Sequence, residues 1–204
     1  MRPKGDMNEL DDTYYIQKVL DGKTEFFSRL VNRYSQRIYW LILKIVRRKE
    51  DAEELTQDVF VKTFRVLYTF KGDCRFSTWL YRIAYNTAIS ATRKKKHEFL
   101  YIEEQTINNV LDEKVEQALE DSDNEELLRK LESAREQLNP EERGLIGLFY
   151  NEEHTIEEIS EISGLSIANV KVKLHRIRKK LYVIMEEMLS LIHISEPTRL
   201  ALIS

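Results

Sequence analysis

The sequence predicts an all-α protein of two small helical domains joined by an acidic linker, with a helix-turn-helix in the second domain. Three observations support this fold class. The 204 residues include only 6 glycines and 3 prolines, so long helices meet few breakers. Apolar side chains recur every three or four residues over most of the chain, which is the period of a helix. The stretch 98–124 lacks that period and is acidic, which separates two periodic regions.

The first predicted domain, residues 11–97, opens with strongly periodic apolar positions. They are Phe27, Leu30, Val31, Tyr34, Ile38, Leu41, Ile42 and Ile45. This spacing gathers them on one face of a helix, which indicates that they contribute to the core of the domain.

Two further helices are expected in the same domain. The charge-rich sequence RRKEDAEE marks a connection, and Asp51 is expected to cap a helix from about Ala52 to Tyr68. The pair Gly72-Asp73 then predicts a turn. After that turn, Ser77 is expected to cap a third helix that runs to about Lys96.

The helix from Ala52 carries a charged stripe. One face holds Asp51, Glu54, Asp58, Lys62 and Arg65, while Leu55, Val59 and Phe64 are expected to turn inward. An acidic stripe of this kind can dock on a basic helix of a partner. Taken alone, the pattern is more typical of a solvated face whose neighbouring charges pair with one another.

The helix from Ser77 interleaves aromatic and basic side chains. The residues expected to be buried are Phe76, Trp79, Leu80, Ile83, Ala84, Thr87 and Ala88. Those expected on the surface are Tyr81, Arg82, Tyr85, Asn86, Ile89, Ser90 and Arg93, followed by three lysines. Aromatic rings among bases can hold unstacked nucleotides and their backbone. For Tyr81 and Tyr85, a place in the core is the alternative.

The linker, residues 98–124, is expected to be mostly extended or partly disordered. The second predicted domain, residues 125–188, begins with a helix from Glu125 to Leu138 that Asn139-Pro140 stops. A helix from Glu141 to Tyr150 is expected next.

A helix-turn-helix is then predicted from cap and turn residues. Thr155 caps a short helix with an isoleucine face, Gly164 supplies a tight turn beside a buried Leu165, and Ser166 caps the next helix. The apolar stripe of that second helix is Ile167, Val170, Leu174, Ile177 and Leu181. Between these lie Asn169, Lys171, Val172, Lys173, His175, Arg176, Arg178, Lys179 and Lys180. A capped basic helix after such a turn favours entry into a DNA major groove, and the alternative is a solvated basic helix in a bundle.

Composition excludes several other classes. Cys74 is the only cysteine, so a disulfide within the chain and a site with several thiolate ligands are both ruled out. The N-terminal sequence has no apolar core like that of a signal peptide, and no apolar run approaches a membrane span, so a cytoplasmic location is expected. No catalytic motif, metal site or cofactor site is predicted. Residues 189–204, which contain LSLIHISEPTR, are interpreted as a translated sequencing adapter and excluded from the fold prediction, and the alternative is a natural polar tail.

Three segments in series resemble one family. EDAEELTQDVFVKTFRVLYTFKG, FSTWLYRIAYNTAISATRKKK and LNPEERGLIGLFYNEEHTIEEISEISGLSIANVKVKLHRIRKKL are similar to sigma factors of the extracytoplasmic-function (ECF) group, within the sigma-70 family. The resemblance implies a transcription initiation factor without enzymatic activity. It also implies core RNA polymerase, promoter DNA and an anti-sigma factor as partners, with no direct insertion into a membrane.

The resemblance also assigns residues to these roles. The face expected to dock on the clamp helices of the polymerase is Asp51, Glu54, Gln57, Asp58 and Lys62. The loop expected to shape a pocket for a flipped base of the minus-ten element is Lys71, Gly72, Asp73, Cys74 and Phe76. The expected contacts to the non-template strand are Arg82, Asn86, Ser90 and Arg93. The expected contacts to the minus-thirty-five duplex are Ser166, Asn169, Lys171, Val172, Lys173, His175 and Arg176. The family more often has arginine where Lys171 stands, and Val172 is apolar, so the resemblance leaves the promoter sequence undetermined.

The sequence can also be compared with two other classes of function, a helix-turn-helix regulator and an enzyme. A conventional helix-turn-helix activator or repressor would use the first domain for dimerisation or sensing, but this leaves the aromatic and basic helix without a role. An enzyme is disfavoured because the carboxylates lie on charged helix faces without a recognisable catalytic motif.

Overall fold

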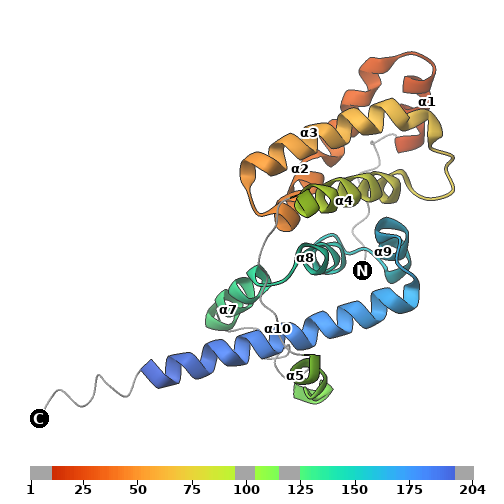
Figure 1. Ribbon diagram of the computed structural model, residues 1–204. Helices are drawn as coiled ribbons and strands as arrows, with labels where there is room; N and C mark the ends of the chain where they lie inside the picture. The colour runs from red at the N-terminus through yellow and green to blue at the C-terminus, as the bar shows by residue number, and fades with distance from the viewer. Residues whose placement is uncertain (1–10, 95–103, 115–124, 196–204) are drawn as a thin grey trace, which may run out of the picture.

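The computed structural model (Figure 1) describes residues 11–94, 104–114 and 125–195. In these ranges the chain is helical and contains no strand, as the sequence predicts. The N-terminal elements are α1 (Asp12–Leu20), η1 (Thr24–Phe26), α2 (Phe27–Val46), α3 (Lys49–Val66), η2 (Leu67–Thr69) and α4 (Phe76–Lys94). The later elements are α5 (Glu104–Asn108), α7 (Glu125–Glu136), α8 (Pro140–Ile146), the π-helical turn η3 (Gly147–Asn151), α9 (Ile156–Ser163) and α10 (Ile167–Ser195).

The N-terminal bundle is built around α2, which packs against both α3 and α4. The periodic residues expected in its core are confirmed there: Leu30, Ile38, Leu41, Ile42 and Ile45 are at most 1% exposed. Phe27 and Val31 are half-buried beside them. Helical spacing alone therefore identified the central face of this bundle.

Two expected caps are wrong. α3 begins at Lys49 after Arg48, so Asp51 lies inside its first turn, where its charge still favours the helix dipole. α4 begins at Phe76, so Ser77 lies inside this helix as well. The Phe76 ring packs against Phe70, Trp79 and Tyr34, and this aromatic packing accompanies the start of α4.

The C-terminal bundle follows its local signals closely. The side chain of Thr155 accepts a hydrogen bond from the backbone N–H of Glu158, and the Glu158 carboxylate accepts one from the N–H of Thr155. Gly164 ends α9 in the left-handed region at φ 75°, which few other residues adopt without strain. The hydroxyl of Ser166 accepts from the N–H of Asn169 at 3.2 Å. These cap and turn predictions are confirmed, whereas Leu165 is half-buried.

Two segments differ from expectation. The stretch predicted to be extended contains the short helix α5, whose Ile107 is only 8% exposed, and α5 packs against α10. The remainder of that stretch, 98–103 and 115–124, lies outside the described residues. α10 continues to Ser195, into the segment 189–204 that was set apart, and residues 196–204 lie outside the description.

The two bundles pack directly on each other (Figure 1), with α8 and α9 against α4 and α8 against α2. Their buried apolar side chains form one continuous cluster. Gly144 of α8 sits so close to α4 that a Cβ atom there would lie 2.6 Å from Cε2 of Tyr85. A larger residue at this position would push the bundles apart.

Arg143 of α8 stabilises the contact between the two bundles. Its guanidinium donates to the carbonyl oxygens of Lys44 (2.9 Å) and Ile45 (2.7 Å) at the end of α2, and to that of Leu138 before α8. A helix end leaves such carbonyls without partners inside the helix. Arg143 is 9% exposed, and burial, with the nearby charge of Arg47, lowers its pKa to about 10.

No helix in the described ranges combines the length and hydrophobicity that a membrane crossing needs.

We expect Arg143→Met to lower the free energy of unfolding by about 2–4 kcal/mol, because it leaves buried carbonyls without a charged donor. Urea denaturation followed by circular dichroism measures this change. The matched control is Arg29→Met on the exposed side of α2, expected to change stability by no more than about 0.5 kcal/mol. Equal stabilities for the two variants would contradict the role given to Arg143.

Candidate nucleic-acid and protein interfaces

The charged stripe of α3 is exposed. Glu54, Gln57, Asp58 and Lys62 point to solvent, and Asp51 is half-buried with one carboxylate oxygen 4.0 Å from Nε of Arg48. Val61 (49% exposed) and Phe64 (40% exposed) also reach the surface of α3. Phe64 was expected to turn inward, but its ring contacts Phe27 at the edge of the bundle instead. The surface of α3 is therefore partly apolar, which sequence charge patterning did not reveal.

The polar residues of α4 form one exposed stripe. Arg82, Asn86, Ser90 and Arg93 follow one another by three or four residues, and each is exposed. Their spacing places them on successive turns of a single helix face. Nη2 of Arg93 lies 3.4 Å from a carboxylate oxygen of Glu141 on α8.

The aromatic residues of α4 do not share that stripe. Tyr81, Tyr85 and Ile89 were placed on the surface but are 2%, 5% and 6% exposed. For the tyrosines the core alternative is the correct one. The reason is tertiary, because α8 and α9 cover the side of α4 that an isolated N-terminal bundle would expose.

Tyr81 contacts two residues of the second bundle. Its hydroxyl donates to the Glu152 carboxylate, and its ring centroid lies 4.6 Å from that of His154. Burial raises the pKa of Tyr81, and the hydrogen bond to Glu152 raises it further. Burial also raises the pKa of Tyr85, which faces Gly144.

The loop before α4 is exposed at its tip and aromatic at its base. Lys71, Gly72 and Asp73 are exposed, and Gly72 has φ 79°, as its predicted turn requires. Cys74 is half-buried, and burial raises the pKa of its thiol. Phe76 is 5% exposed, so its ring supports the loop from within.

The first turns of α10 present most of the predicted duplex contacts. Ser166, Asn169, Lys171, Val172, His175 and Arg176 are exposed, and Lys173 is partly so. The opposite face is the predicted apolar stripe, with Val170, Leu174, Ile177 and Leu181 buried. Ile167 is 43% exposed and does not belong to that stripe.

The later basic residues of α10 are engaged within the chain. Nε of Arg178 donates to the Tyr150 hydroxyl at 2.8 Å, and its guanidinium stacks on two aromatic rings of η3. Lys180 is 9% exposed and pairs with Glu142 at 2.9 Å. The basic run is therefore only partly a solvent-facing surface, because its last members stabilise the bundle.

Two carboxylates that sequence reasoning did not single out contact the basic residues of α10. Asp112, in the predicted linker, lies 2.8 Å from Nζ of Lys179 and 3.3 Å from Nε2 of His175. Glu141 lies 3.8 Å from Nζ of Lys173. Nothing in the sequence pattern indicates these pairs, since they join separate elements.

Within the described residues, no three His, Cys, Asp or Glu side chains are grouped so that they could hold a metal ion.

Comparisons with known families match both bundles. The model of sigma-70 region 2 matches residues 30–98, and that of sigma-70 region 4 matches residues 128–181. Together these matches cover more than half of the chain.

Comparisons with individual proteins give the same family. The chain is 29% identical over 179 residues to the ECF RNA polymerase sigma factor SigW of Bacillus subtilis, covering 81% of this chain and 92% of that protein. It is also 29% identical to the RNA polymerase sigma factor CarQ of Myxococcus xanthus, covering 85% of this chain and 97% of that protein.

Two solved structures share the fold. CnrH, solved in complex with the cytosolic domain of CnrY, superposes with a TM-score of 0.59 at 22% identity, covering 86% of this chain and 97% of that one. The sigma factor RpoE of Bartonella quintana, solved in complex with the anti-sigma factor NepR, has a TM-score of 0.57 at 19% identity, covering 78% of this chain and 96% of that one.

The buried tyrosines give the packed state a pH dependence. Tyr81 and Tyr85 keep their protons in the folded chain well above the pH, about 10, at which an unfolded tyrosine releases its own. Their contribution to stability is complete below pH 10 and is lost as the pH rises above it. The loss should reach about 1.4 kcal/mol per pH unit for each tyrosine.

Tyr81→Phe is therefore expected to flatten the fall of unfolding free energy above pH 10, which denaturation at several alkaline pH values measures. The matched control is Tyr68→Phe, because Tyr68 is 76% exposed and should leave the slope as it is. If the unfolding free energy falls equally steeply with pH in the two variants, Tyr81 is not a source of the pH dependence.

Proposed function

Because this chain belongs to the ECF group of the sigma-70 family of transcription initiation factors, we propose that it binds core RNA polymerase, recognises minus-ten and minus-thirty-five promoter elements, and promotes strand opening. The observation that carries this proposal is the presence of two separate basic, exposed helix faces, on α4 and α10, in a chain that matches both sigma regions.

The proposed site for the polymerase is the exposed stripe of α3. Its charged members are Asp51, Glu54, Gln57, Asp58 and Lys62, and the neighbouring Val61 adds apolar area. Carboxylates fit a basic helix of a partner, while an exposed valine supplies contact that excludes water. The combination is typical of a protein interface more than of a solvated helix.

The proposed minus-ten site is the loop before α4 together with the α4 stripe. Lys71, Gly72, Asp73 and Cys74 would border a pocket for an extruded base, and Phe76 would support it from below. The stripe of Arg82, Asn86, Ser90 and Arg93 would then follow the backbone of the opened strand. Capturing an unstacked base offsets the few kcal/mol that unstacking costs, so opening needs no nucleotide hydrolysis.

The proposed minus-thirty-five site is the first half of α10 in a major groove. Lys171, Lys173, His175 and Arg176 would supply contacts to phosphates and base edges, and Val172 would touch a thymine methyl group. Ser166 and Asn169 stand at the N-terminal end of the helix, where backbone N–H groups favour phosphate.

The promoter geometry requires the two bundles to separate. The two elements lie about 25 base pairs apart, or about 85 Å of B-form DNA. α4 and α10 are much closer than that in the packed chain, where α8 and α9 contact both. With α5 unwound and released from α10, the segment between α4 and α7 can reach roughly 100 Å at about 3.3 Å per extended residue. The linker is therefore long enough for both sites to be filled at once.

The remaining partners follow from the same assignment. The solved relatives CnrH and RpoE were each captured with a second protein, named as an anti-sigma factor for RpoE. We propose that an anti-sigma factor also holds this chain inactive, and that the chain acts in the cytoplasm, where RNA polymerase works. We propose no enzymatic activity and no cofactor for it.

Run-off transcription with core polymerase on a randomised promoter library tests the central proposal. Transcripts from a defined subset of promoters are expected only when the chain is added. Asp58→Arg should reduce polymerase affinity by about tenfold or more, because it turns an attraction in the interface into a repulsion. Glu25→Arg, on the exposed surface of η1, is the control and should bind like the natural chain. Transcripts that appear equally well without the chain would sink the proposal.

The α4 stripe has a separate test. Arg82→Ala should lower strand opening about three- to tenfold, measured as permanganate reactivity of unpaired thymines, because it removes a phosphate contact to the opened strand. Binding of core polymerase should not change. Arg29→Ala serves as the control, and strand opening that is equal in both variants would exclude Arg82 from the minus-ten site.

A further inference from the structure

The chain places its own carboxylates against side-chain nitrogens of α10. Asp112 lies 2.8 Å from Nζ of Lys179 and 3.3 Å from Nε2 of His175. The hydrogen bond from Lys179 lowers the pKa of Asp112, so this carboxyl group is ionised at neutral pH. The short helix just before Asp112 is anchored by Ile107, which is 8% exposed in a segment packed against α10. The acidic segment is therefore docked on the helix.

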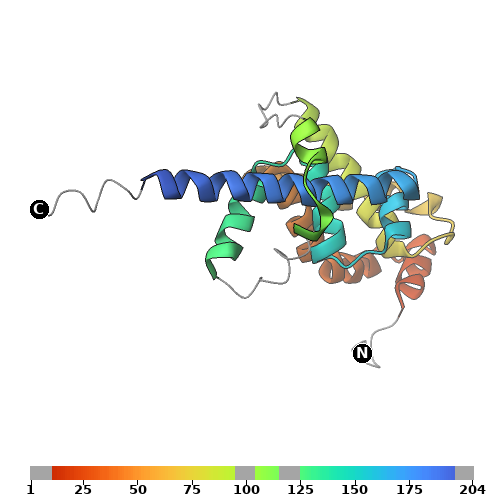
Figure 2. The same cartoon turned by 90° about the horizontal axis from the view of Figure 1, so that it is seen from below.

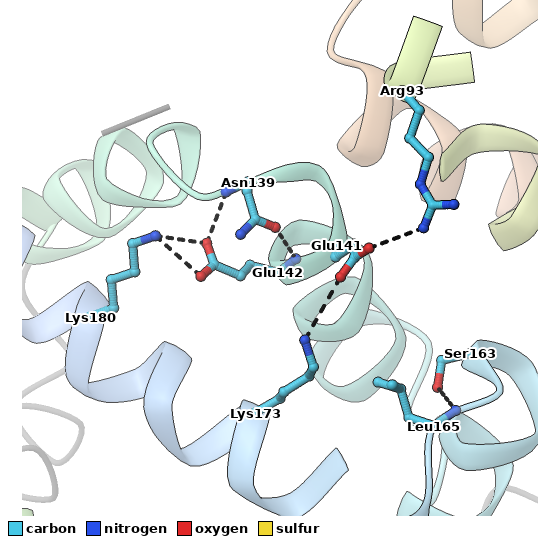
Figure 3. Close-up of polar contacts among 8 residues, drawn as sticks. All are labelled: Arg93, Asn139, Glu141, Glu142, Ser163, Leu165, Lys173 and Lys180. Atoms are coloured by element: carbon cyan, nitrogen blue, oxygen red, sulfur yellow. Dashed lines mark hydrogen bonds and ion pairs between the residues drawn. The ribbon is translucent and has the colours of Figure 1, made fainter. Parts of the chain in front are cut away.

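Glu141 bridges the two helices that the proposed function assigns to DNA (Figure 3). One of its carboxylate oxygens is 3.4 Å from Nη2 of Arg93 on α4, and the other is 3.8 Å from Nζ of Lys173 on α10. A single side chain thus contacts a proposed minus-ten residue and a proposed minus-thirty-five residue together.

The neighbouring structure explains why Glu141 is available for this bridge. α8 begins with a reciprocal cap between Asn139 and Glu142, and Glu142 also pairs with Lys180 (Figure 3). Glu142 therefore stabilises the first turn of α8. Glu141, the residue before it, takes no part in that cap and points between α4 and α10.

A carboxylate and a DNA phosphate are both anionic oxygen acceptors, and they compete for the same N–H donors. While Lys173, His175 and Arg93 contact carboxylates of the chain, each of those contacts competes with a phosphate for the same side-chain donor group. We propose that Asp112 and Glu141 act as internal substitutes for DNA phosphates. They weaken DNA binding by the packed chain. Because Glu141 contacts both α4 and α10, its displacement frees both helices for DNA together. This inference rests on the proposed function.

The expected effect is graded, because these pairs are partly exposed: Arg93, Glu141 and Lys173 have 73%, 47% and 43% of their side-chain surface accessible. Exposed pairs are individually weak and screened by salt. The suppression of DNA binding should therefore be measurable at low salt and should fade as the salt concentration is raised. Removing both carboxylates should increase DNA affinity more than removing either one.

The test is the affinity of the full chain, without polymerase, for a short fluorescent duplex of random sequence, measured by anisotropy at about 50 mM and about 200 mM salt. Asp112→Asn and Glu141→Gln should each tighten binding about two- to threefold at low salt, and the double variant about five- to tenfold. The gain should shrink at the higher salt concentration.

Removing any negative charge favours DNA, so the control carries the same change of charge elsewhere. Glu25→Gln with Glu53→Gln alters exposed carboxylates on η1 and α3, outside both proposed DNA sites. Melting curves of all variants establish that the fold is retained. If the Asp112/Glu141 double variant binds DNA no more tightly than this control, the inference is overturned.

A last variant separates this inference from the function on which it rests. Lys171→Gln with Arg176→Gln, added to the double variant, should abolish most of its binding. If it does not, DNA is not bound through α10, and the proposed minus-thirty-five site fails. If it does, while removal of the two carboxylates gives no gain over the control, only the internal competition fails.

Discussion

The packed form of this molecule depends on the guanidinium of Arg143. α2 ends with its chain turned into the left-handed region at Arg47, which leaves carbonyls at its end without helical partners. Arg143 reaches two of these carbonyls from the other bundle and also binds Leu138 O at the start of its own helix. Because the guanidinium is charged and buried, losing its acceptors would lower the stability of the fold strongly. A lysine could not replace it, because an ammonium lacks the planar set of donors that reaches all three carbonyls. The position of α8, and with it Gly144 against Tyr85, is fixed by this arrangement.

From that constraint follows the two-sided character of α4. One side is buried by the second bundle and holds the tyrosines, while the other carries the exposed stripe from Arg82 to Arg93. α4 packs against helices on two sides, so its apolar residues do not form a single narrow stripe. Aromatic residues therefore occur on both sides of its core stripe. If the bundles separate on a promoter, as we propose, Tyr81 and Tyr85 become exposed beside the stripe.

The features that sequence reasoning predicted correctly are those with partners a few residues away. Thr155, Gly164 and Ser166 act within one helical turn, so their spacing identifies the helix-turn-helix directly. Two misses are local, since Asp51 and Ser77 were expected as caps but lie inside their helices. The other misses are long-range. Arg143 binds carbonyls 98 and 99 residues away, and α5 is held by contact with α10. Neither has a local signature. The ion pairs of Asp112 and Glu141 belong to the same class, since charge composition shows that the linker is acidic but not which base it meets.

The direction from which polymerase is proposed to approach bears on the order of events. α3 packs on α2 and α4, whereas α8 and α9 lie on the other side of α4 (Figure 1). α10 lies beyond α8 and α9, and it crosses in front of them in Figure 2. The exposed stripe of α3 is therefore accessible while the bundles are packed, so docking there does not require Arg143 or Tyr81 to release their partners. DNA binding differs, because in the proposed competition the contacts of Arg93, Lys173 and His175 with carboxylates weaken it while the bundles are packed. An accessible surface on α3, together with two DNA-binding surfaces that the proposed competition weakens, favours polymerase binding first and promoter binding second.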